Sequence, residues 1–342
     1  YLSLIDEVPM GDTPAFEVGA GQCALIHTGG MLPDGTDAVV MLEYAQSIAK
    51  KEVEVFRAVA EGENVIRIGE DVVQGQTVLA KGSLIRPAEI GGLMALGIIK
   101  IRVMRKIRVG LISTGDEVID PGQSPRAGQV RDVNSYTLGA LVEKSGGAAK
   151  LYGVVSDMFD TVKATAAQAL SECDIVFLSA GSSASTRDMT ADVIRTLGEP
   201  GVLVHGINTR PGKPTILGVC NGKAVIGLPG NPVSALVNGY LFVVPVIEKL
   251  LGALSQPRSS VLAQLTVNLP SQAGREDWWP VKLTAEPRSL GDSVVSKIKF
   301  QAAPIFGKSN LIFTLAAADG LIRIHPDATG LAVGEIVAVY LL

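Results

Sequence analysis

The middle third of the chain alternates between two patterns of apolar residues. Continuous apolar runs of strand length, each followed by a polar loop, occur at RVGLIST (108–114), AKLYGVV (149–155) and DIVFLSAG (174–181). Between and after them the apolar residues recur with the period of a helix, at 135–146, 159–172 and 189–198. This alternation predicts a central doubly wound α/β sheet, continued by an apolar stretch at 202–207, a hairpin turning at Asn221 and Gly222, and a closing helix over Pro232–Leu251.

Shorter apolar runs on either side predict β-structure. Before residue 107, β-like segments are expected at 23–27, 38–42, 53–57 and 64–67, followed by a helix at about 86–96 and a strand at IKIRVM (99–104). After residue 254 no strong helix is expected, and the short strands there suggest a small β-barrel or a sandwich. The predicted multidomain α/β plus β fold has an N-terminal β-rich domain with a helical linker (1–106), an α/β domain (107–254) and a C-terminal β-barrel domain (255–342).

Composition excludes several classes of function. The 342 residues suit two or three domains, and 47% hydrophobic residues are enough to form their cores. The net charge of −4 with scattered Lys and Arg argues against a nucleic-acid surface. No uninterrupted apolar run approaches 18 residues, so no membrane span is expected. The three cysteines are far apart, which fits a reducing compartment, and a cytoplasmic protein is expected.

Five polar loops follow the predicted strands: STGDEV (113–118), SDMFD (156–160), SAGSSASTRDMT (179–190), TRPGKP (209–214) and PGNPVS (229–234). Each alone is typical of a turn or a helix cap. The carboxyl ends of parallel strands meet at one edge of a sheet, where ligands bind in such folds. Together the loops bring carboxylates, cations and hydroxyls to that edge. Asn231 and Pro232 also suit the start of a helix, whose free N–H groups attract anions.

The mixture of charges suggests a metal and an anionic ligand. Asp116, Glu117, Asp157 and Asp188 are hard oxygen ligands that suit Mg²⁺. Arg187, Arg210 and Lys213 suit a phosphate or another oxyanion, and capping alone would not need both signs of charge. A nucleotide P-loop is excluded, because Ile207 stands where its first glycine should be, and Pro214 would block the helix start.

Several linked motifs resemble one known family. STGDEV, SAGSSASTRDMT, RPGKPT and GLPGNPVSA, in this order, are similar to the molybdopterin molybdenumtransferases (MoeA type, which includes the E domain of gephyrin). The similarity continues through IHTGGMLPDGTDAVVMLE, IGEDV and LAKG in the first part and through GREDW and GKSN in the last. It spans nearly the whole chain. The related molybdopterin adenylyltransferases share only the middle domain, so the flanking domains favour the first family.

The resemblance implies roles for individual residues. It implies that Asp116, Glu117, Asp157 and Asp188 are catalytic, with Glu117 and Asp188 as metal ligands. It implies substrate contacts for Thr28, Asp71, Thr114, Gly115, Ser182, Ser183, Arg210, Lys213 and Asn231. Thr28 and Asp71 would reach the cleft of a partner subunit. The molybdate pocket would be formed by Lys213, Ser234, Arg275 and Ser309.

The reaction implied is insertion of molybdenum from molybdate into adenylylated molybdopterin, with release of AMP and assistance from Mg²⁺. The implied partners are a second copy in a homodimer and a molybdopterin adenylyltransferase. Alternative functions are a carrier of molybdopterin or molybdate without turnover, a scaffold protein, and an adenylyltransferase. The carboxylates favour an enzyme, because a carrier of anions would gain nothing from negative charges beside its ligand.

Some positions depart from the family pattern. The family begins with helices and a SAMDGYA-like segment that carries a functional Asp, and this sequence starts just after that point. A chain without that segment would lack part of the lid over the site. Arg210 stands where the family often has Lys, and SAG (179–181) stands where it tends to have SGG. These changes leave the anion-binding chemistry intact.

Overall fold

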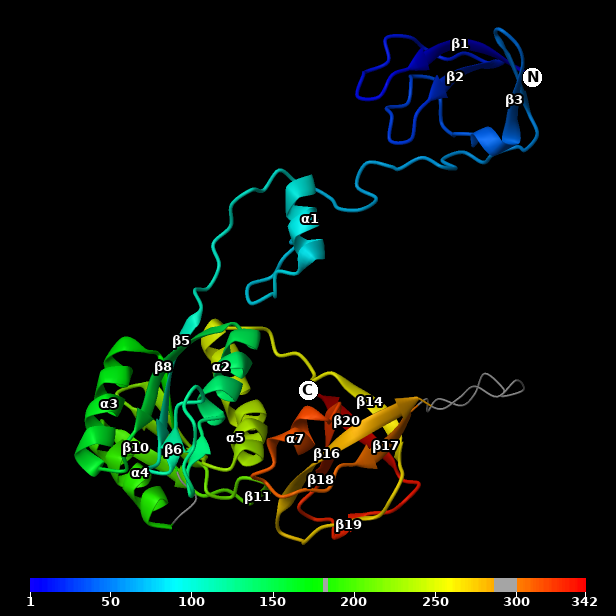
Figure 1. Ribbon diagram of the computed structural model, residues 1–342. Helices are drawn as coiled ribbons and strands as arrows, with labels where there is room; N and C mark the ends of the chain where they lie inside the picture. The colour runs from blue at the N-terminus through cyan, green and yellow to red at the C-terminus, as the bar shows by residue number, and fades with distance from the viewer. Residues whose placement is uncertain (181–183, 286–299) are drawn as a thin grey trace. The chain divides into compact units, whose positions relative to one another are not determined.

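The computed structural model describes residues 1–180, 184–285 and 300–342. Within the helix that starts at Ala184, side chains are described only from residue 189 onward. The chain divides into two compact units, Tyr1–Ala80 and Lys81–Leu342. The second unit contains the α/β sheet and the C-terminal barrel (Figure 1).

The first unit is built on a four-stranded sheet in the order β2-β1-β4-β3. β1 pairs in parallel with β2 and antiparallel with β4, and β3 pairs antiparallel with β4. A 3₁₀ turn at Leu42–Tyr44 precedes β3. The β-rich character predicted for this region is confirmed, with strands β1 (Leu2–Val8), β2 (Gln22–Ile26), β3 (Ala45–Ala49) and β4 (Glu52–Val55).

Two of the strands expected in this unit are loops, so that prediction was wrong. Residues 38–42 and 64–67 lie side by side, since the Val39 N–H donates to the Glu63 carbonyl at 3.0 Å and Asn64 Nδ2 donates to the Val39 carbonyl at 2.7 Å. Asn64 has a φ of 61°, in the left-handed region. That conformation ends an extended run, so the two segments do not continue into a ladder.

The segment between the first unit and the sheet holds one helix. α1 (Pro87–Ala95) is formed where the sequence predicts it, with Pro87 at its start. The strand expected at 99–104 is not formed, because no described strand pairs with these residues. An ion pair fixes the end of the segment: the Arg105 guanidinium donates to both oxygens of Asp174, at 2.7 and 2.8 Å, and holds the pKa of that carboxyl at about 2.

The predicted doubly wound α/β domain is confirmed. Its sheet has the order β10-β12-β13-β9-β5-β8, and every strand except β12 runs in the same direction. Helices α3 and α4 cover one face, and α2, α5 and α6 lie on the other (Figure 1). The elements are β5 (Ile107–Thr114), α2 (Asn134–Lys144), β8 (Gly147–Val155), α3 (Phe159–Glu172), β9 (Ile175–Ala180), α4 (Ala184–Thr196), β10 (Pro200–His205), β12 (Ile216–Cys220) and β13 (Lys223–Pro229), with a small pairing of β6 (Val118–Ile119) and β7 (Val130–Arg131).

The predicted hairpin is also confirmed. Cys220 pairs with Lys223 across a two-residue turn made by Asn221 (φ 51°) and Gly222 (φ 79°). Positive φ at both positions is the turn that Asn-Gly favours between antiparallel strands. The hairpin reverses the chain inside a sheet that is otherwise parallel.

The helix expected over Pro232–Leu251 is interrupted once. α5 (Pro232–Asn238) and α6 (Val244–Leu251) are joined by a π-helical turn at Gly239–Val243. Gly239 lies against α2, where a Cβ would stand 2.7 Å from a methyl group of Leu141. Among the described residues this is the one helix with the length and apolar content to cross a membrane, and it is partly buried in the α/β core. Its apolar character is therefore that of a core helix.

The last domain is a closed β-barrel. Of the two architectures that the sequence left open, a barrel and a sandwich, the barrel is therefore the one formed. Five strands follow one another around it in the order β16-β17-β14-β20-β18, and β18 pairs with β16 to close the ring. β11 (Thr209–Arg210), from the α/β domain, adds to β16 in parallel. A short helix α7 (Ile312–Ala316) was not expected. The strands are β14 (Ser260–Leu265), β16 (Glu276–Ala285), β17 (Phe300–Pro304), β18 (Gly320–Ile324) and β20 (Ile336–Leu341), with β15 (Leu269–Pro270) paired to β19 (Gly330–Leu331) outside the ring.

A buried amide holds the loop after β11 against α5. Asn238 is fully buried, and its Nδ2 donates to the Pro211 carbonyl at 3.1 Å and to the Ser234 carbonyl at 2.7 Å. Gly212, with a φ of 107°, passes so close that a Cβ would stand 1.6 Å from that nitrogen. A glycine is therefore required at 212 for both conformation and space.

We expect Gly212→Ala to destabilise the protein by about 2 kcal/mol or more, because the methyl group collides with Asn238 and the residue keeps a positive φ. A matched control is Gly222→Ala, where φ is 79° and nothing lies within 4 Å of the added Cβ. That variant should cost about 1 kcal/mol, the effect of the backbone conformation alone. Thermal unfolding midpoints measure both, and equal losses would show that contact with Asn238 does not constrain the loop.

Candidate active site

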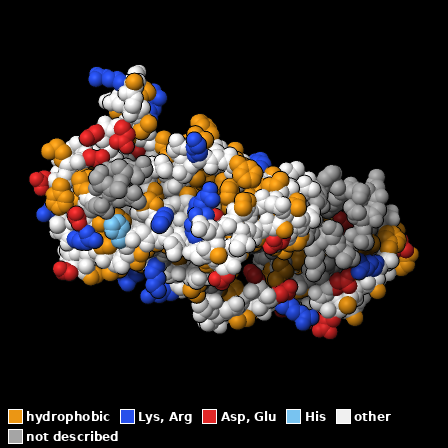
Figure 2. All heavy atoms as spheres, turned by 90° about the horizontal axis from the view of Figure 1, so that it is seen from below, with side chains coloured by type: hydrophobic (Ala, Val, Ile, Leu, Met, Phe, Trp, Pro, Cys, Tyr) orange, Lys and Arg blue, Asp and Glu red, His pale blue; other side chains and the backbone are white. Residues whose placement is uncertain are grey.

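The polar loops emerge at one edge of the α/β sheet, as predicted. β5, β8, β9 and β13 are parallel, and β10 regains their direction because β12 reverses the chain between β10 and β13. The carboxyl ends of all five parallel strands therefore share this edge. Figure 2 views the molecule from this side and shows Lys and Arg side chains exposed on it.

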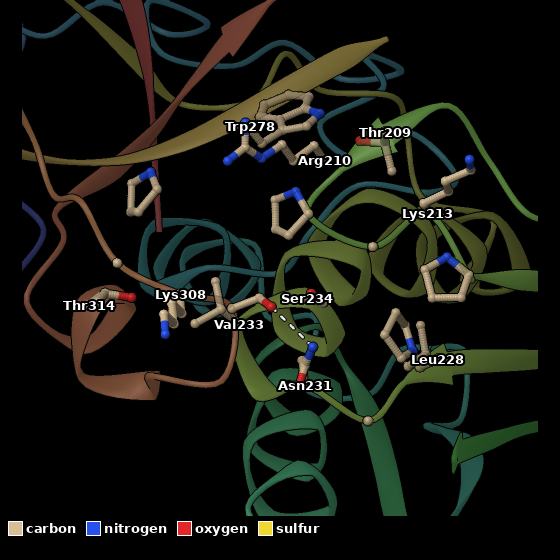
Figure 3. Close-up of a pocket in the computed structure, with 18 of the residues that line it drawn as sticks. Thr209, Arg210, Lys213, Leu228, Asn231, Val233, Ser234, Trp278, Lys308 and Thr314 are labelled. Atoms are coloured by element: carbon tan, nitrogen blue, oxygen red, sulfur yellow. Dashed lines mark hydrogen bonds between the residues drawn. The ribbon is translucent and has the colours of Figure 1, made fainter. Parts of the chain in front are cut away.

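A cavity of about 540 Å³ lies where this edge meets the barrel. The α/β domain contributes the loop at 209–214 and the turn from β13 into α5. The barrel contributes Trp278 and Trp279 from β16, and the loop before α7. Figure 3 shows Arg210 beside Trp278 on one side of the cavity, with Asn231 and Lys308 on the other. Both domains are thus needed to form it.

Four cationic side chains line the cavity: Arg210, Lys213, Arg275 and Lys308. The Arg210 guanidinium carbon lies 5.4 Å from the centre of the Trp279 ring, in cation–π contact. Arg275 donates to the buried carboxylate of Asp277 through Nε (2.7 Å) and Nη2 (3.1 Å). Among the described residues, Lys213 and Lys308 make no ion pair. Positive charge is therefore in excess here.

The start of α5 forms the wall between the two domains. The Asn231 amide donates to the Ser309 hydroxyl at 3.1 Å (the dashed line in Figure 3), and the Val233 N–H donates to the Ser309 carbonyl at 3.0 Å. Asn231 occupies the N-cap position but makes no capping bond with its side chain. Because the Val233 N–H already donates to the barrel, this helix start has one N–H group fewer for an anion than the sequence alone suggests. Ser234 lies beside it and is buried.

A second group of polar residues occupies the same edge at the ends of β5 and β8. Gly115 has a φ of 145°, and a Cβ there would stand 2.9 Å from the Glu117 carboxylate, which explains the glycine in TGDE. The Asp157 N–H donates to Asp116 at 3.2 Å. The Thr114 hydroxyl and one carboxylate oxygen of Asp157 are buried at this edge. The two side chains interact with each other, since Thr114 lowers the pKa of Asp157.

The surroundings of Asp157 disfavour the ionised form of its carboxyl. Burial raises its pKa, and the neighbouring charges of Asp116 and Glu117 raise it further, against an opposing effect of Thr114. No group of three or more acidic, His or Cys side chains close enough to hold a metal ion is found among the described residues. A cation bound here would therefore also need ligands from water or substrate.

A buried network supports the edge from below. The Ser113 hydroxyl donates to Asp132 at 2.9 Å and lies 2.9 Å from the Ser135 hydroxyl. Asn134 donates to the Ser179 hydroxyl at 2.6 Å and to the Gly230 carbonyl at 2.9 Å. The network ties the ends of β5, β9 and β13 to the start of α2, so the loops are fixed relative to one another.

The structure brings part of the predicted site together. Six predicted residues share the cavity: Arg210, Lys213, Asn231, Ser234, Arg275 and Ser309. Five others form the acidic group: Thr114, Gly115, Asp116, Glu117 and Asp157. Thr28 and Asp71 are exposed on loops of the first unit. Ser182, Ser183 and the side chain of Asp188 lie outside the described residues.

Sequence reasoning missed three residues of the cavity and one buried behind it. Lys308 stands next to Ser309 in GKSN, and the two tryptophans of the chain, Trp278 and Trp279, are adjacent in GREDWW. The lysine beside Ser309 and the pair of adjacent tryptophans could both have been picked out from the sequence. Asp277 lies in β16, two residues after Arg275, which stands just before that strand.

Comparisons with known proteins agree with this architecture. A family model for the MoeA N-terminal region (domain I and II) matches residues 3–97, one for a probable molybdopterin binding domain matches 110–249, and one for the MoeA C-terminal region (domain IV) matches 263–342. The three matches follow chain order. They cover the sheet of the first unit, the α/β domain and the barrel.

Individual relatives extend over most of the chain. The molybdopterin molybdenumtransferase of Haemophilus influenzae is 34% identical over 301 residues, which are 86% of this chain and 73% of that protein. The one from Bacillus subtilis is 29% identical and covers 99% of this chain and 77% of its own length. A MoeA protein of known structure from Pyrococcus horikoshii OT3 has a TM-score of 0.79 at 33% identity, covering 100% of this chain and 81% of that one. On these matches, the chain belongs to the MoeA family of molybdopterin molybdenumtransferases.

Proposed function

We propose that this protein transfers molybdenum from molybdate to adenylylated molybdopterin and releases AMP. One observation carries the proposal: a cavity shared by two domains is lined by four cationic side chains, two of them without an ion pair in the described part of the chain. In the reaction, water cleaves the bond that joins the phosphate of molybdopterin to the phosphate of AMP. Molybdenum binds the two dithiolene sulfurs, and their protons leave with one molybdate oxygen as water.

The cavity suits the oxyanion. Molybdate is a tetrahedral dianion, so it needs both positive charge and several hydrogen-bond donors. Lys213 and Arg275 supply charge from opposite domains, and the hydroxyls of Ser234 and Ser309 supply further donors. An arginine fork and a lysine ammonium complement each other here, because the first fixes direction and the second supplies charge.

The cavity also suits an organic ligand. Its volume of about 540 Å³ falls within the range of sites for small organic molecules. Trp278 and Trp279 give it an aromatic wall against which a flat heterocycle could pack. We infer that the oxyanion and the end of the molybdopterin that receives the metal meet in this space, which would hold the reacting atoms near one another.

The acidic group fits Mg²⁺. Its donors are all oxygen, and Thr114 and Asp157 each have a buried oxygen there. Mg²⁺ commonly binds one or two carboxylates together with substrate phosphates and water. We infer that Glu117 and Asp157 hold it, with Asp188 as a further ligand from α4 and with water and a phosphate of the substrate. When bound, the ion would neutralise charge on the phosphates of the substrate.

The side chains themselves would orient the substrate. The carboxylates and the cations lie on the same sheet edge but in separate groups, so a substrate that spans both is held at two ends. Gly115 allows the chain to turn closely, so the backbone N–H groups of Asp116 and Glu117 can approach a phosphate, whereas that of Gly115 donates to the Val155 carbonyl. This arrangement would leave the phosphorus centre open to water.

We also infer a homodimer in the cytoplasm. Apolar side chains are exposed along α1 and the segment after it, including Ile90, Met94, Ile99 and Val103. A second copy that covers them would explain such a surface. Thr28 and Asp71 would then contact substrate held by the other copy. The three cysteines are unpaired, in keeping with a reducing compartment.

Molybdate-dependent release of AMP tests the proposal. With Mg²⁺, the protein should release AMP from adenylylated molybdopterin, faster with molybdate, and EDTA should stop the reaction. Lys213→Ala should raise the KM for molybdate by about 10- to 100-fold, the effect of losing one charged contact. Asp188→Ala should abolish turnover.

Lys249→Ala, at the exposed end of α6, is a matched control and should behave as the unaltered protein. Chromatography of the nucleotide products measures every variant. Binding of adenylylated molybdopterin without release of AMP would instead identify a carrier, and the absence of both binding and release would refute the assignment.

The raised pKa of Asp157 predicts that its ionised carboxylate, which the function requires, lowers the stability of the fold. Its folded-state pKa lies above the unfolded value, so ionisation of this carboxyl opposes folding at neutral pH, and the cost disappears as the pH falls through the folded pKa. Asp157→Asn should therefore be as stable as the unaltered protein or more stable at pH 7, and lose that advantage in acid.

The same variant tests the metal site. Mg²⁺ should raise the unfolding midpoint of the unaltered protein and have little effect on Asp157→Asn, because a ligand that binds only the folded state stabilises it. Thermal scans over a pH series with and without Mg²⁺ measure both effects. A variant that is less stable at pH 7, with an unchanged response to Mg²⁺, would contradict this role of Asp157.

A further inference from the structure

Asp277 is a fully buried carboxylate next to Trp278, one of the residues that line the cavity. It accepts two hydrogen bonds from Arg275, at 2.7 and 3.1 Å, and Arg210 Nη1 stands 3.9 Å from its second oxygen. The first arginine belongs to the barrel and the second to the α/β domain. A buried charge is costly unless it is paired, so this position is suited to a carboxylate only while the arginines remain beside it.

The pairing restricts how the arginines can meet a ligand. Arg275 has five N–H donors, and two of them are directed at Asp277. The guanidinium is planar, so fixing two donors fixes the direction of the remaining three. Arg210 is held more loosely: it stands 3.9 Å from the carboxylate, beyond hydrogen-bond distance, with its side chain about half exposed, and 5.4 Å from the centre of the Trp279 ring.

Fixed donors matter because the cavity is large. At about 540 Å³ it has room for a small organic molecule, and its walls cannot enclose a four-oxygen anion on all sides. Discrimination between a larger oxyanion such as molybdate and a smaller one such as sulfate must then come from where the donors stand. Rigid donors favour the anion whose oxygens match their spacing, whereas mobile donors adapt to either.

We propose that Asp277 is a positioning residue that fixes Arg275 and Arg210 and thereby sets the preference of the cavity for molybdate over smaller tetrahedral anions. The proposal rests on the function proposed above. It assigns no contact between Asp277 and the substrate. The carboxylate also cancels one positive charge, which limits the attraction of the cavity for anions in general.

Asp277→Asn separates position from charge. The amide keeps the shape of the side chain but loses the charge that holds both arginines. Release of AMP would be followed against molybdate concentration, and inhibition by sulfate would be measured in the same assay. We expect the ratio of the sulfate Ki to the molybdate KM to fall about tenfold, equivalent to about 1.4 kcal/mol of lost discrimination. Asp277→Glu, which restores the charge, should recover part of the ratio.

Asp319→Asn is the matched control. This carboxylate also belongs to the barrel, but it pairs at 2.8 Å with Lys282, which does not line the cavity. It should keep the ratio of the unaltered protein, which distinguishes selectivity from a general loss of barrel stability. Unfolding midpoints of all the variants would be recorded alongside.

Each outcome of these measurements either supports or overturns the proposal. A reduced ratio in Asp277→Asn, with partial recovery in Asp277→Glu, supports the positioning role. An unchanged ratio in an active Asp277→Asn overturns it and leaves the proposed function intact. Equal loss of the ratio in Asp319→Asn also overturns it, since the effect would then follow from stability. An unaltered protein whose AMP release does not respond to molybdate would refute the proposed function itself, and the inference with it.

Discussion

The pairing of β11 with β16 is the contact on which the cavity depends. Two residues of the α/β domain, Thr209 and Arg210, lie in register with Glu276 and Asp277 of the barrel. The Glu276 N–H donates to the Asn208 carbonyl at 2.9 Å, and the Thr209 hydroxyl donates to the Glu276 carbonyl at 3.2 Å. On the other side of the cavity, Ser309 binds the start of α5. The space is therefore held between two interdomain contacts.

The separation of charges along the sheet edge follows from electrostatics. A carboxylate placed among the cations of the cavity would pair with them and remove the positive charge that an oxyanion needs. Asp277 is the exception, and it is buried behind the arginines and not exposed to the ligand space. The exposed carboxylates, Asp116 and Glu117, instead follow β5, on the far side of β9 from the cavity.

Elements with a strong local pattern could be predicted from the sequence. α3 begins and ends where its periodicity does, and the Asn221–Gly222 turn defines its hairpin. The shared edge of the five loops also followed from topology rules alone. The segments at 38–42 and 99–104 have β-like composition, but a strand needs a neighbour, and neighbours are set by the rest of the fold. For the same reason Asp277 was missed, because its importance arises only when Arg210 arrives from another domain.

The single reversed strand in the sheet has a consequence for the size of the site. Adjacent strands lie about 4.8 Å apart, so inserting β12 between β10 and β13 moves the end of β10 to about 10 Å from the end of β13. The loop at 209–214 leaves from one of these ends and α5 from the other, while Ile216, the first residue of β12, forms the floor between them. The width of the opening is thus set in whole strand spacings. Without β12, β10 and β13 would be neighbours, and the two loops would start about one strand spacing, roughly 4.8 Å, apart.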